Sequence, residues 1–177
     1  MSRCSVGVDP GKDGGIVVLD SNNELVSYHT IPKINNLIDT NLLSNIFENI
    51  FSIYDCFVCI EQVHSIYGVA SSANFNFGYN CGIIEGMVSY SKVPYIYVQP
   101  KIWQAEMLKG IPTMFIPSLK SLKKQKKDTK KMAELAVKRL YPNIDLYVTS
   151  KGNVSKNIHD GLADALLIAG YNLRKNF

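Results

Sequence analysis

The order of the apolar runs limits the fold of this chain more than any other feature of its sequence. Three short runs with the composition of β-strands come first, at Arg3–Asp9, Gly15–Asp20 and Leu25–Thr30. Turn-forming residues separate them, Pro10-Gly11 in the first gap and Asn22-Asn23 in the second. The chain therefore opens with a predicted antiparallel meander of three strands.

A helix and a fourth strand are expected after the meander. Between residues 36 and 54 the apolar side chains recur at spacings of one, three and four, the pattern of an amphipathic helix. Residues 56–63 (CFVCIEQV) form a nearly continuous apolar run, which is typical of a central buried strand. Because a helical crossover joins strands of one sheet, commonly in parallel, the fourth strand is expected to lie parallel to the first.

The sequence pattern of the second half of the chain predicts mainly helices. The expected elements are a helix over 72–91, a strand over 95–99, a short helix containing Trp103, a basic loop over 109–127, a helix from Asp128 or Thr129 to before Pro142, and a last helix from near His159.

Three glycines recur every fourth residue on the helix predicted over 72–91. They are Gly78, Gly82 and Gly86, and each costs a helix about 1 kcal/mol relative to alanine. A line of glycines predicts a flat helix face that another backbone approaches closely. That backbone is either the chain's own sheet, the interpretation favoured by the residues alone, or a second subunit.

The composition excludes several classes of protein. With 46% apolar and 19% charged residues among 177, the chain has the make-up of one ordinary globular domain rather than a disordered or fibrous protein. It has no stretch of about 18 uncharged apolar residues, and its first strand leaves no room for a signal peptide. We therefore expect no membrane association and no secretion. The four cysteines are expected to be reduced core residues: Cys4, Cys56, Cys59 and Cys81.

The positive charge is concentrated in one segment. Residues 120–139 hold nine of the 19 basic residues and two of the 15 acidic ones, so this segment carries +7 against +4 for the whole chain. Such a run is often only a solvated face, but here the other charges are sparse, which favours a polyanion partner, chiefly nucleic acid. The lysines expected to contact it are Lys120, Lys123, Lys124, Lys126, Lys127, Lys130 and Lys131.

Three carboxylates stand in apolar surroundings where an unpaired charge is costly. Asp9 ends the run CSVGVD, Glu61 ends CFVCIE, and Asp164 lies within LADALLIAG. If the first and fourth strands are parallel neighbours, Asp9 and Glu61 emerge at one edge of the sheet. Asp160 lies four residues before Asp164, hence on the same helix face. The alternatives are a turn role for Asp9 and a helix-capping role for Asp160.

Four carboxylates from three elements suit oxygen-seeking Mg²⁺ or Mn²⁺. Two such ions can activate a water for attack on a phosphodiester and stabilise the departing 3′ oxygen, while lysines hold neighbouring phosphates. His64 and His159 lie close in sequence to the candidate ligands. Each is either a proton shuttle or outer ligand, or an ordinary surface histidine.

At this point the motifs resemble a known family. The order of elements is that of the ribonuclease H-like fold, and GVDPGKDGGIVVLD, CIEQVH and HDGLADALLIAGY resemble the RuvC family of Holliday junction resolvases, especially its phage and viral branch. FNFGYNCGIIEGM and VPYIYVQPKIWQ resemble that branch too, so the similarity covers nearly the whole chain. It implies a single RuvC-like nuclease domain over 1–177, of α/β class, with a mixed five-stranded sheet (the antiparallel meander plus two parallel strands) flanked by helices.

The resemblance also implies an activity and the residues that carry it. The expected protein is a dimeric, Mg²⁺-dependent endonuclease that cuts four-way DNA junctions symmetrically and leaves 5′-phosphate ends, in the host cytoplasm or at a viral replication site. Asp9, Glu61 and Asp164 match metal ligands of the family. Asp160 matches a fourth, but with a spacing of four where the bacterial enzymes have three, so His159 is the substitute candidate. The glycine-bearing helix matches the family's dimer interface, which shifts the expectation toward a homodimer.

One departure concerns DNA stacking. His64 stands where the bacterial enzymes carry an aromatic wedge, and Tyr67 or Phe75 is the candidate to replace it. Two alternatives to a resolvase stay open, namely a less selective flap or fork nuclease and a junction-binding scaffold without catalysis. An actin-like ATPase, suggested by VDPGKDGG, is disfavoured because such proteins need two domains of this kind and about twice the length.

Overall fold

The computed structural model describes residues 1–177 except 63–69, 119–120, 151–152 and 155–157. Its centre is a mixed five-stranded sheet in the order β3-β2-β1-β6-β7. The meander is confirmed, with β1 (Arg3–Asp9), β2 (Gly15–Asp20) and β3 (Leu25–Thr30) pairing antiparallel. The parallel half is formed by β6 (Asp55–Glu61), which pairs with β1 and with β7 (Tyr95–Val98).

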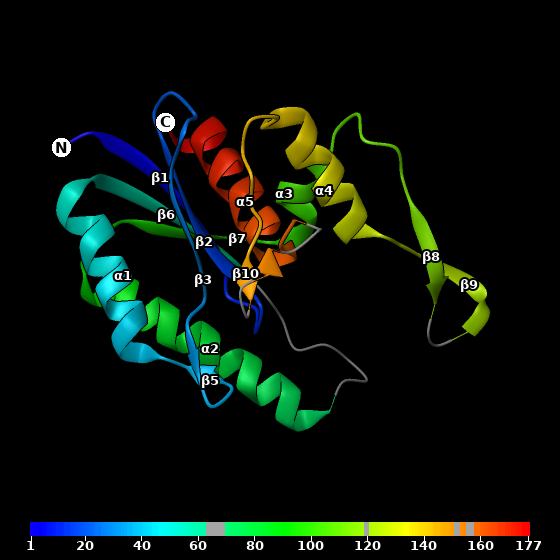
Figure 1. Ribbon diagram of the computed structural model, residues 1–177, viewed down its shortest axis with the longest axis horizontal. Coiled ribbons are helices and arrows are strands. Elements are labelled where there is room, and N and C mark those ends of the chain that lie inside the picture. The colour runs from blue at the N-terminus through cyan, green and yellow to red at the C-terminus, as the bar shows by residue number, and fades with distance from the viewer. Residues whose placement is uncertain (63–69, 119–120, 151–152, 155–157) are drawn as a thin grey trace.

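Helices cover both faces of this sheet (Figure 1). One face carries α1 (Thr40–Ile53) and α2 (Ser71–Tyr90), and the other carries α3 (Pro100–Met107), α4 (Thr129–Leu140) and α5 (Asp160–Asn176). Each face has its own apolar core, one built around Phe47 and Ile84 and the other around Trp103 and Leu166. The sheet is therefore buried on both sides, which explains the continuous apolar runs of β1 and β6.

The last helix, α5, packs closely against β1, the central strand of the sheet. A side chain at Gly7 of β1 would collide with the backbone of α5 at Ala165 and Ala169, so only glycine permits this contact. Two buried polar side chains fix it: Ser5 Oγ donates to the Ala169 carbonyl over 2.8 Å, and Asn172 Nδ2 donates to Ser5 Oγ over 2.9 Å. The position of α5 on β1 is thereby set, and with it the position of the acids that α5 carries.

Two predicted segments differ from the structure. The helix expected from residue 36 begins at Thr40, because Asn35 and Asn36 adopt positive φ (52° and 65°) in a tight hairpin. That hairpin joins β4 (Lys33–Ile34) to β5 (Leu37–Ile38), and Asp39 then caps α1 by accepting from the Leu42 N–H over 3.0 Å.

The predicted basic loop over 109–127 is wrong in its second half, which forms a hairpin of β8 (Phe115–Ser118) and β9 (Ser121–Lys127). Lysines and a proline disfavour central strands, but they are common on strands with an open edge, which this hairpin has. A further small hairpin pairs β10 (Thr149–Ser150) with β11 (Asn153–Val154).

The glycine-bearing face of α2 does not pack on the chain's own sheet, so that interpretation is wrong. A side chain added at Gly78, Gly82 or Gly86 would have no atom of the described residues within 4 Å. The residues of α2 that are buried are Ile84 and Val88, on another side of the helix. The glycine line is therefore open to contact from outside the chain.

The cysteines are free, as expected, but not all are in the core. Cys4, Cys56 and Cys59 are buried, whereas Cys81 on α2 is only partly buried. Cys4 and Cys56 are paired in register on neighbouring strands, with their sulfur atoms in a 2.7 Å hydrogen bond. Among the described residues, no helix has the length and apolar character needed to cross a bilayer.

Candidate active site

Two of the predicted acids lie together at the carboxyl ends of parallel strands. Val8 of β1 is in register with Ile60 of β6, and Asp9 and Glu61 are the next residues of these two strands. Both side chains therefore leave the sheet at the same edge, as the sequence predicted. Asp9 also has the turn role considered as its alternative, since its Oδ1 accepts from the Gly11 N–H over 2.8 Å.

The N-terminal half of α5 brings the other two acids to this edge. Its first residues meet the β1–β2 turn, where Gly161 and Gly14 form an isolated parallel bridge, and a side chain at Gly161 would collide with the Asp13 carbonyl. Asp160 and Asp164 both line a surface cavity at this point. The other charged or titratable residues around this cavity are Asp9, Asp13, Lys130 and His159.

Electrostatics show that three of the acids share one environment. Burial, and then the charge of Asp9, raise the pKa of Glu61 to about 7. Burial raises the pKa of Asp164 well above its usual range, and the charges of Asp9 and Glu61 raise it further. Burial also raises the pKa of Asp9, although the Gly11 N–H and Lys130 oppose the effect. Negative charge at this edge is therefore undercompensated, as expected of a site that takes a cation.

Asp160 is different from the other three acids. It is exposed, and its Oδ2 accepts from the Lys130 ammonium over 2.6 Å. Lys130 belongs to the predicted basic segment, so this ion pair joins the start of α4 to the acidic edge. Asp160 is not the cap of α5, because that role falls to the preceding residue.

His159 caps α5, with its Nδ1 accepting from the Leu162 N–H over 3.3 Å. Burial lowers the pKa of His159, which favours the neutral ring. If Nδ1 accepts a hydrogen bond, then Nε2 of the neutral ring carries the proton and has no lone pair for a metal. In this arrangement His159 is a capping residue, and Asp160 is the better placed of the two candidates for the fourth ligand.

The charge and the oxygen donors of the acids suit a divalent ion, but their side chains do not surround a common point. Asp9, Glu61 and Asp164 supply oxygen donors whose charges repel one another, which is the donor set that Mg²⁺ and Mn²⁺ prefer. Within the described parts of the chain, however, no three His, Cys, Asp or Glu side chains stand close enough to form a group that could hold an ion. Glu61 is also not part of the cavity lining. The charge and the donor type of these three acids therefore favour metal binding here.

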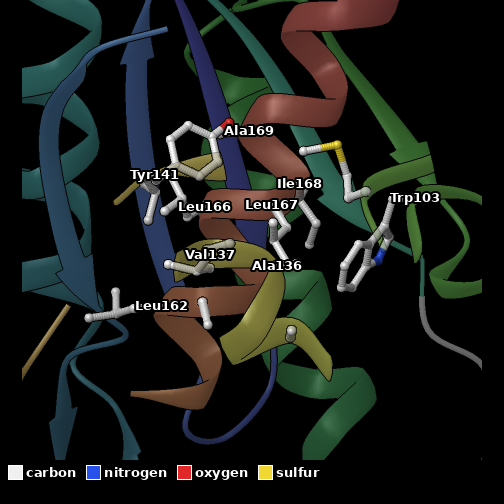
Figure 2. Close-up of a cluster of buried hydrophobic side chains, with 14 of the residues drawn as sticks. Trp103, Ala136, Val137, Tyr141, Leu162, Leu166, Leu167, Ile168 and Ala169 are labelled. Atoms are coloured by element: carbon white, nitrogen blue, oxygen red, sulfur yellow. The ribbon is translucent and has the colours of Figure 1, made fainter. Parts of the chain in front are cut away.

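Trp103 holds Glu61, and sequence reasoning did not assign it this role. Its Nε1 donates to Glu61 Oε1 over 2.8 Å, and its side chain is only 1% exposed. Figure 2 shows Trp103 of α3 beside a cluster whose other labelled residues lie on α4 and α5, apart from Tyr141, which directly follows α4. The available signal was general: a buried indole N–H usually has an acceptor, and a carboxylate that ends a buried strand is a suitable one.

Replacing Trp103 by Phe is expected to lower any metal-dependent activity of this site by about ten- to a hundred-fold. Phe keeps the buried aromatic ring but removes the N–H donor, so one oxygen of Glu61 is no longer fixed. The measurement is a divalent-ion titration of DNA cleavage. Met107→Leu, a volume-conserving change in the same helix and core, is the control and should change activity little. A Trp103→Phe protein with wild-type rates at every ion concentration would exclude this positioning role.

Glu61→Gln is expected to stabilise the metal-free protein, and more so as pH rises. In the unfolded chain Glu61 ionises near its usual pKa of 4.5, but in the folded chain only near 7. Folding therefore favours the protonated form. The free energy of unfolding of the wild type falls by up to about 3 kcal/mol as pH rises from 4.5 through 7. Glutamine cannot ionise, yet its amide oxygen can still accept from Trp103.

The measurement is the melting temperature of both proteins in EDTA at pH 4.5, 6 and 8. The difference between them should be near zero at the lowest pH and largest at the highest. Using the difference removes contributions from titrating groups that do not interact with Glu61, such as His159, whose lowered pKa acts in the opposite direction. A constant difference across this range would show that Glu61 is not in the environment described.

The predicted DNA-binding lysines fall into two groups. Those on β9 include Lys126 and Lys127, which are exposed, and also Lys123 and Lys124. In Figure 1 the β8–β9 hairpin extends away from the sheet and its helices. The lysines at the start of α4 are ion-paired instead, Lys130 with Asp160 and Lys131 with Glu134 over 2.7 Å.

Three predicted DNA contacts lie outside the described residues, namely His64, Tyr67 and Lys120. The other stacking candidate, Phe75, is placed on α2. Its ring is 71% exposed and stacks on Tyr79, with centroids 6.4 Å apart. Phe75 is thus exposed enough for contact with a base.

Comparison with known proteins confirms the fold. No protein-family model matches the sequence, and no curated protein matches it. Among solved structures, the chain is similar to Thermus thermophilus RuvC in complex with a Holliday junction substrate, with a TM-score of 0.62 and 14% identity over 99% of this chain and 96% of that one. A second Thermus thermophilus RuvC structure gives a TM-score of 0.54 and 17% identity, covering 98% and 96% of the two chains.

The sheet and its helices therefore define a ribonuclease H-like α/β fold. Within that class the chain has the RuvC-like arrangement over nearly its whole length. At these identities the likeness establishes the fold alone.

Proposed function

We propose that this chain is a metal-dependent endonuclease that resolves four-way DNA junctions by symmetric phosphodiester hydrolysis, leaving 5′-phosphate ends. One observation carries the proposal: Asp9, Glu61 and Asp164 come from three elements of a RuvC-like fold and meet at one edge of the sheet, where burial raises the pKa of all three, the charge of Asp9 raises that of Glu61, and the charges of Asp9 and Glu61 raise that of Asp164. One of the similar structures contains a Holliday junction substrate, which supports branched DNA as the partner.

The residues of the site have separable tasks in this proposal. Asp9, Glu61 and Asp164, with Asp160 as a fourth candidate, would hold one or two Mg²⁺ or Mn²⁺ ions, which when bound supply an activated water and stabilise the departing 3′ oxygen. The Gly11 N–H and the Trp103 N–H each fix one carboxylate oxygen. Lys130 at the cavity could exchange its ion pair with Asp160 for one with a phosphate, and the exposed Lys126 and Lys127 of β9 could bind the flanking DNA backbone.

Symmetric cutting of a junction requires two active sites, so a homodimer is part of the proposal. The open glycine line on α2 offers a flat surface to a second copy of the helix, and Tyr90 at the end of the same helix is 88% exposed. Sedimentation of the purified chain tests this part. If the chain is a monomer at micromolar concentration, the symmetric part of the proposal is wrong, and the protein would nick one strand at a time.

A panel of DNA substrates tests the proposed function. Cleavage of four-way junctions, forks, flaps and linear duplex is measured with Mg²⁺, with Mn²⁺ and with EDTA. Cutting of the junction alone, in paired positions and only with a divalent ion, is expected. Equal rates on linear duplex would overturn the resolvase assignment, and equal rates on forks and flaps would favour a broader branched-DNA nuclease. Tight junction binding in Ca²⁺ without cutting in Mg²⁺ or Mn²⁺ would favour a scaffold.

A further inference from the structure

A second pocket lies on the other side of the β1–β2 turn from the acidic cavity. Lys12 of this turn lines the second pocket, whereas the next residue, Asp13, lines the acidic cavity. Consecutive Cα atoms are about 3.8 Å apart, so the two hollows are separated by little more than the thickness of one turn. A DNA strand that reaches the acidic cavity would therefore pass this pocket.

The walls of the pocket are held in place by contacts outside it. One wall is the β4–β5 hairpin, and the other is the N-terminal half of α2. Lys33 of the hairpin donates to Asp13 Oδ1 over 2.6 Å, and the Ile31 N–H donates to the Gly14 carbonyl over 3.2 Å. These two contacts fasten the hairpin to the turn that separates the two hollows, so the pocket and the acidic cavity share one support.

The lining has the chemistry of a base-binding site. Its volume is about 420 Å³, within the range of small-ligand pockets and ample for a nucleobase. Leu37 and Phe77 supply apolar and aromatic surface, and Asn36, Asn76 and Asn80 supply amide donors and acceptors. Such amides match the hydrogen-bonding edges of a base. The side chains of Asn76 and Asn80 hydrogen-bond to no other residue that the structure describes, so they are available to a ligand.

Charge and nearby aromatic residues support the same ligand. Lys12 at the rim is exposed and can neutralise a phosphate next to the bound base. Phe75 and Tyr79 of α2 are stacked and exposed close in sequence to the pocket residues, and such rings are the usual platforms for unpaired bases. The pocket borders the same turn as the acidic cavity. This location suits part of a DNA substrate better than an independent small metabolite.

We propose that this pocket binds the base of one unpaired nucleotide in the strand that crosses the acidic cavity. The inference rests on the proposed function and deepens it, because it assigns part of the substrate recognition to Asn36, Asn76 and Asn80. Stacking and hydrogen bonding of one base would give about a ten-fold preference for a junction that presents an unpaired base over one that presents an abasic residue there.

The test uses four-way junctions with one unpaired nucleotide at the centre, carrying either a base or an abasic sugar. Binding to the full chain is measured in Ca²⁺, so that no cutting occurs, at one fixed salt concentration. The wild type is expected to prefer the base about ten-fold. Asn76→Ala combined with Asn80→Ala is expected to bring that preference to within two-fold of unity. Ser89→Ala, an exposed change at the far end of α2, is the control and should keep it.

A variant of the opposite wall guards against misfolding of α2. Asn36→Gly removes the amide but tolerates the positive φ of 65° at this position, and it should also reduce the preference. If the wild type binds and cuts junctions but treats base and abasic sugar alike, the pocket inference is overturned and the proposed function stands. The same holds if both pocket variants keep the ten-fold preference. If the wild type binds no branched DNA, both fail together.

Discussion

Glu61→Gln is expected to reduce junction cleavage by about a thousand-fold or more while changing junction affinity in Ca²⁺ by less than about two-fold. The substitution removes one negative charge and one metal-binding oxygen from an edge where charge is already undercompensated. It removes no group expected to touch a phosphate. Asp9→Asn and Asp164→Asn should behave alike, because each neutralises a carboxylate of the same coupled set.

Asp160→Asn is expected to have a smaller effect, on the order of ten-fold. Asp160 is exposed and already neutralised by Lys130, so its substitution lowers the cation affinity of the site less than substitution of a buried acid does. Glu48→Gln on α1 is the matched control, since it makes the same chemical change on an exposed residue outside the acidic cavity. Cleavage and affinity are measured on the same four-way junction. A Glu61→Gln protein that cuts at the wild-type rate would remove the acids from the mechanism.

The same substitution should therefore have opposite effects on activity and stability. Glu61→Gln raises the melting temperature of the metal-free protein for the reason that it lowers activity, namely that the wild-type site concentrates negative charge for a cation to neutralise. Substitution of a residue that serves only folding would lower both stability and activity, or would change neither. The combined measurement thus separates a functional carboxylate from a structural one.

The sequence predicted the elements whose pattern is local. The bounds of β1, β2 and β3 agree with the predicted runs because alternating apolar residues end at turn-forming pairs. The common edge for Asp9 and Glu61 followed from one inference, that a helical crossover joins parallel strands, and the β1–β6 register confirms it.

The missed features depend on contacts between distant residues. Trp103 and Glu61 are 42 positions apart, and Lys33 and Asp13 are 20 apart, so no local periodicity indicates either pair. Leu37 and Ile38 of the β4–β5 hairpin continue the apolar spacing of the following helix, so the sequence predicts a helix there, whereas the Asn35-Asn36 turn prevents one. The glycine line on α2 predicts a close contact with another backbone, and the structure shows that the described part of the chain's own sheet does not make this contact.

Replacing Lys123, Lys124, Lys126 and Lys127 of β9 together by Gln is expected to weaken junction binding by about a hundred-fold at low salt. It should also reduce the slope of log affinity against log salt by roughly three to four, because each phosphate contact contributes about 0.9 to that slope. Cleavage at saturating protein should change much less, since neither Lys126 nor Lys127, the β9 lysines whose side chains the structure describes, lines the acidic cavity. The measurement is a series of binding titrations between 50 and 200 mM salt.

The control replaces four cations on other elements by Gln, namely Arg3, Lys92, Lys109 and Lys175, which changes the net charge by the same amount. If the β9 hairpin contacts DNA directly, only the β9 variant flattens the salt dependence. If net charge alone attracts the DNA, both variants weaken binding equally. An unchanged slope in the β9 variant would mean that its lysines form a solvated face, and the contacts to the flanking phosphates would then have to come from cations on other parts of the chain.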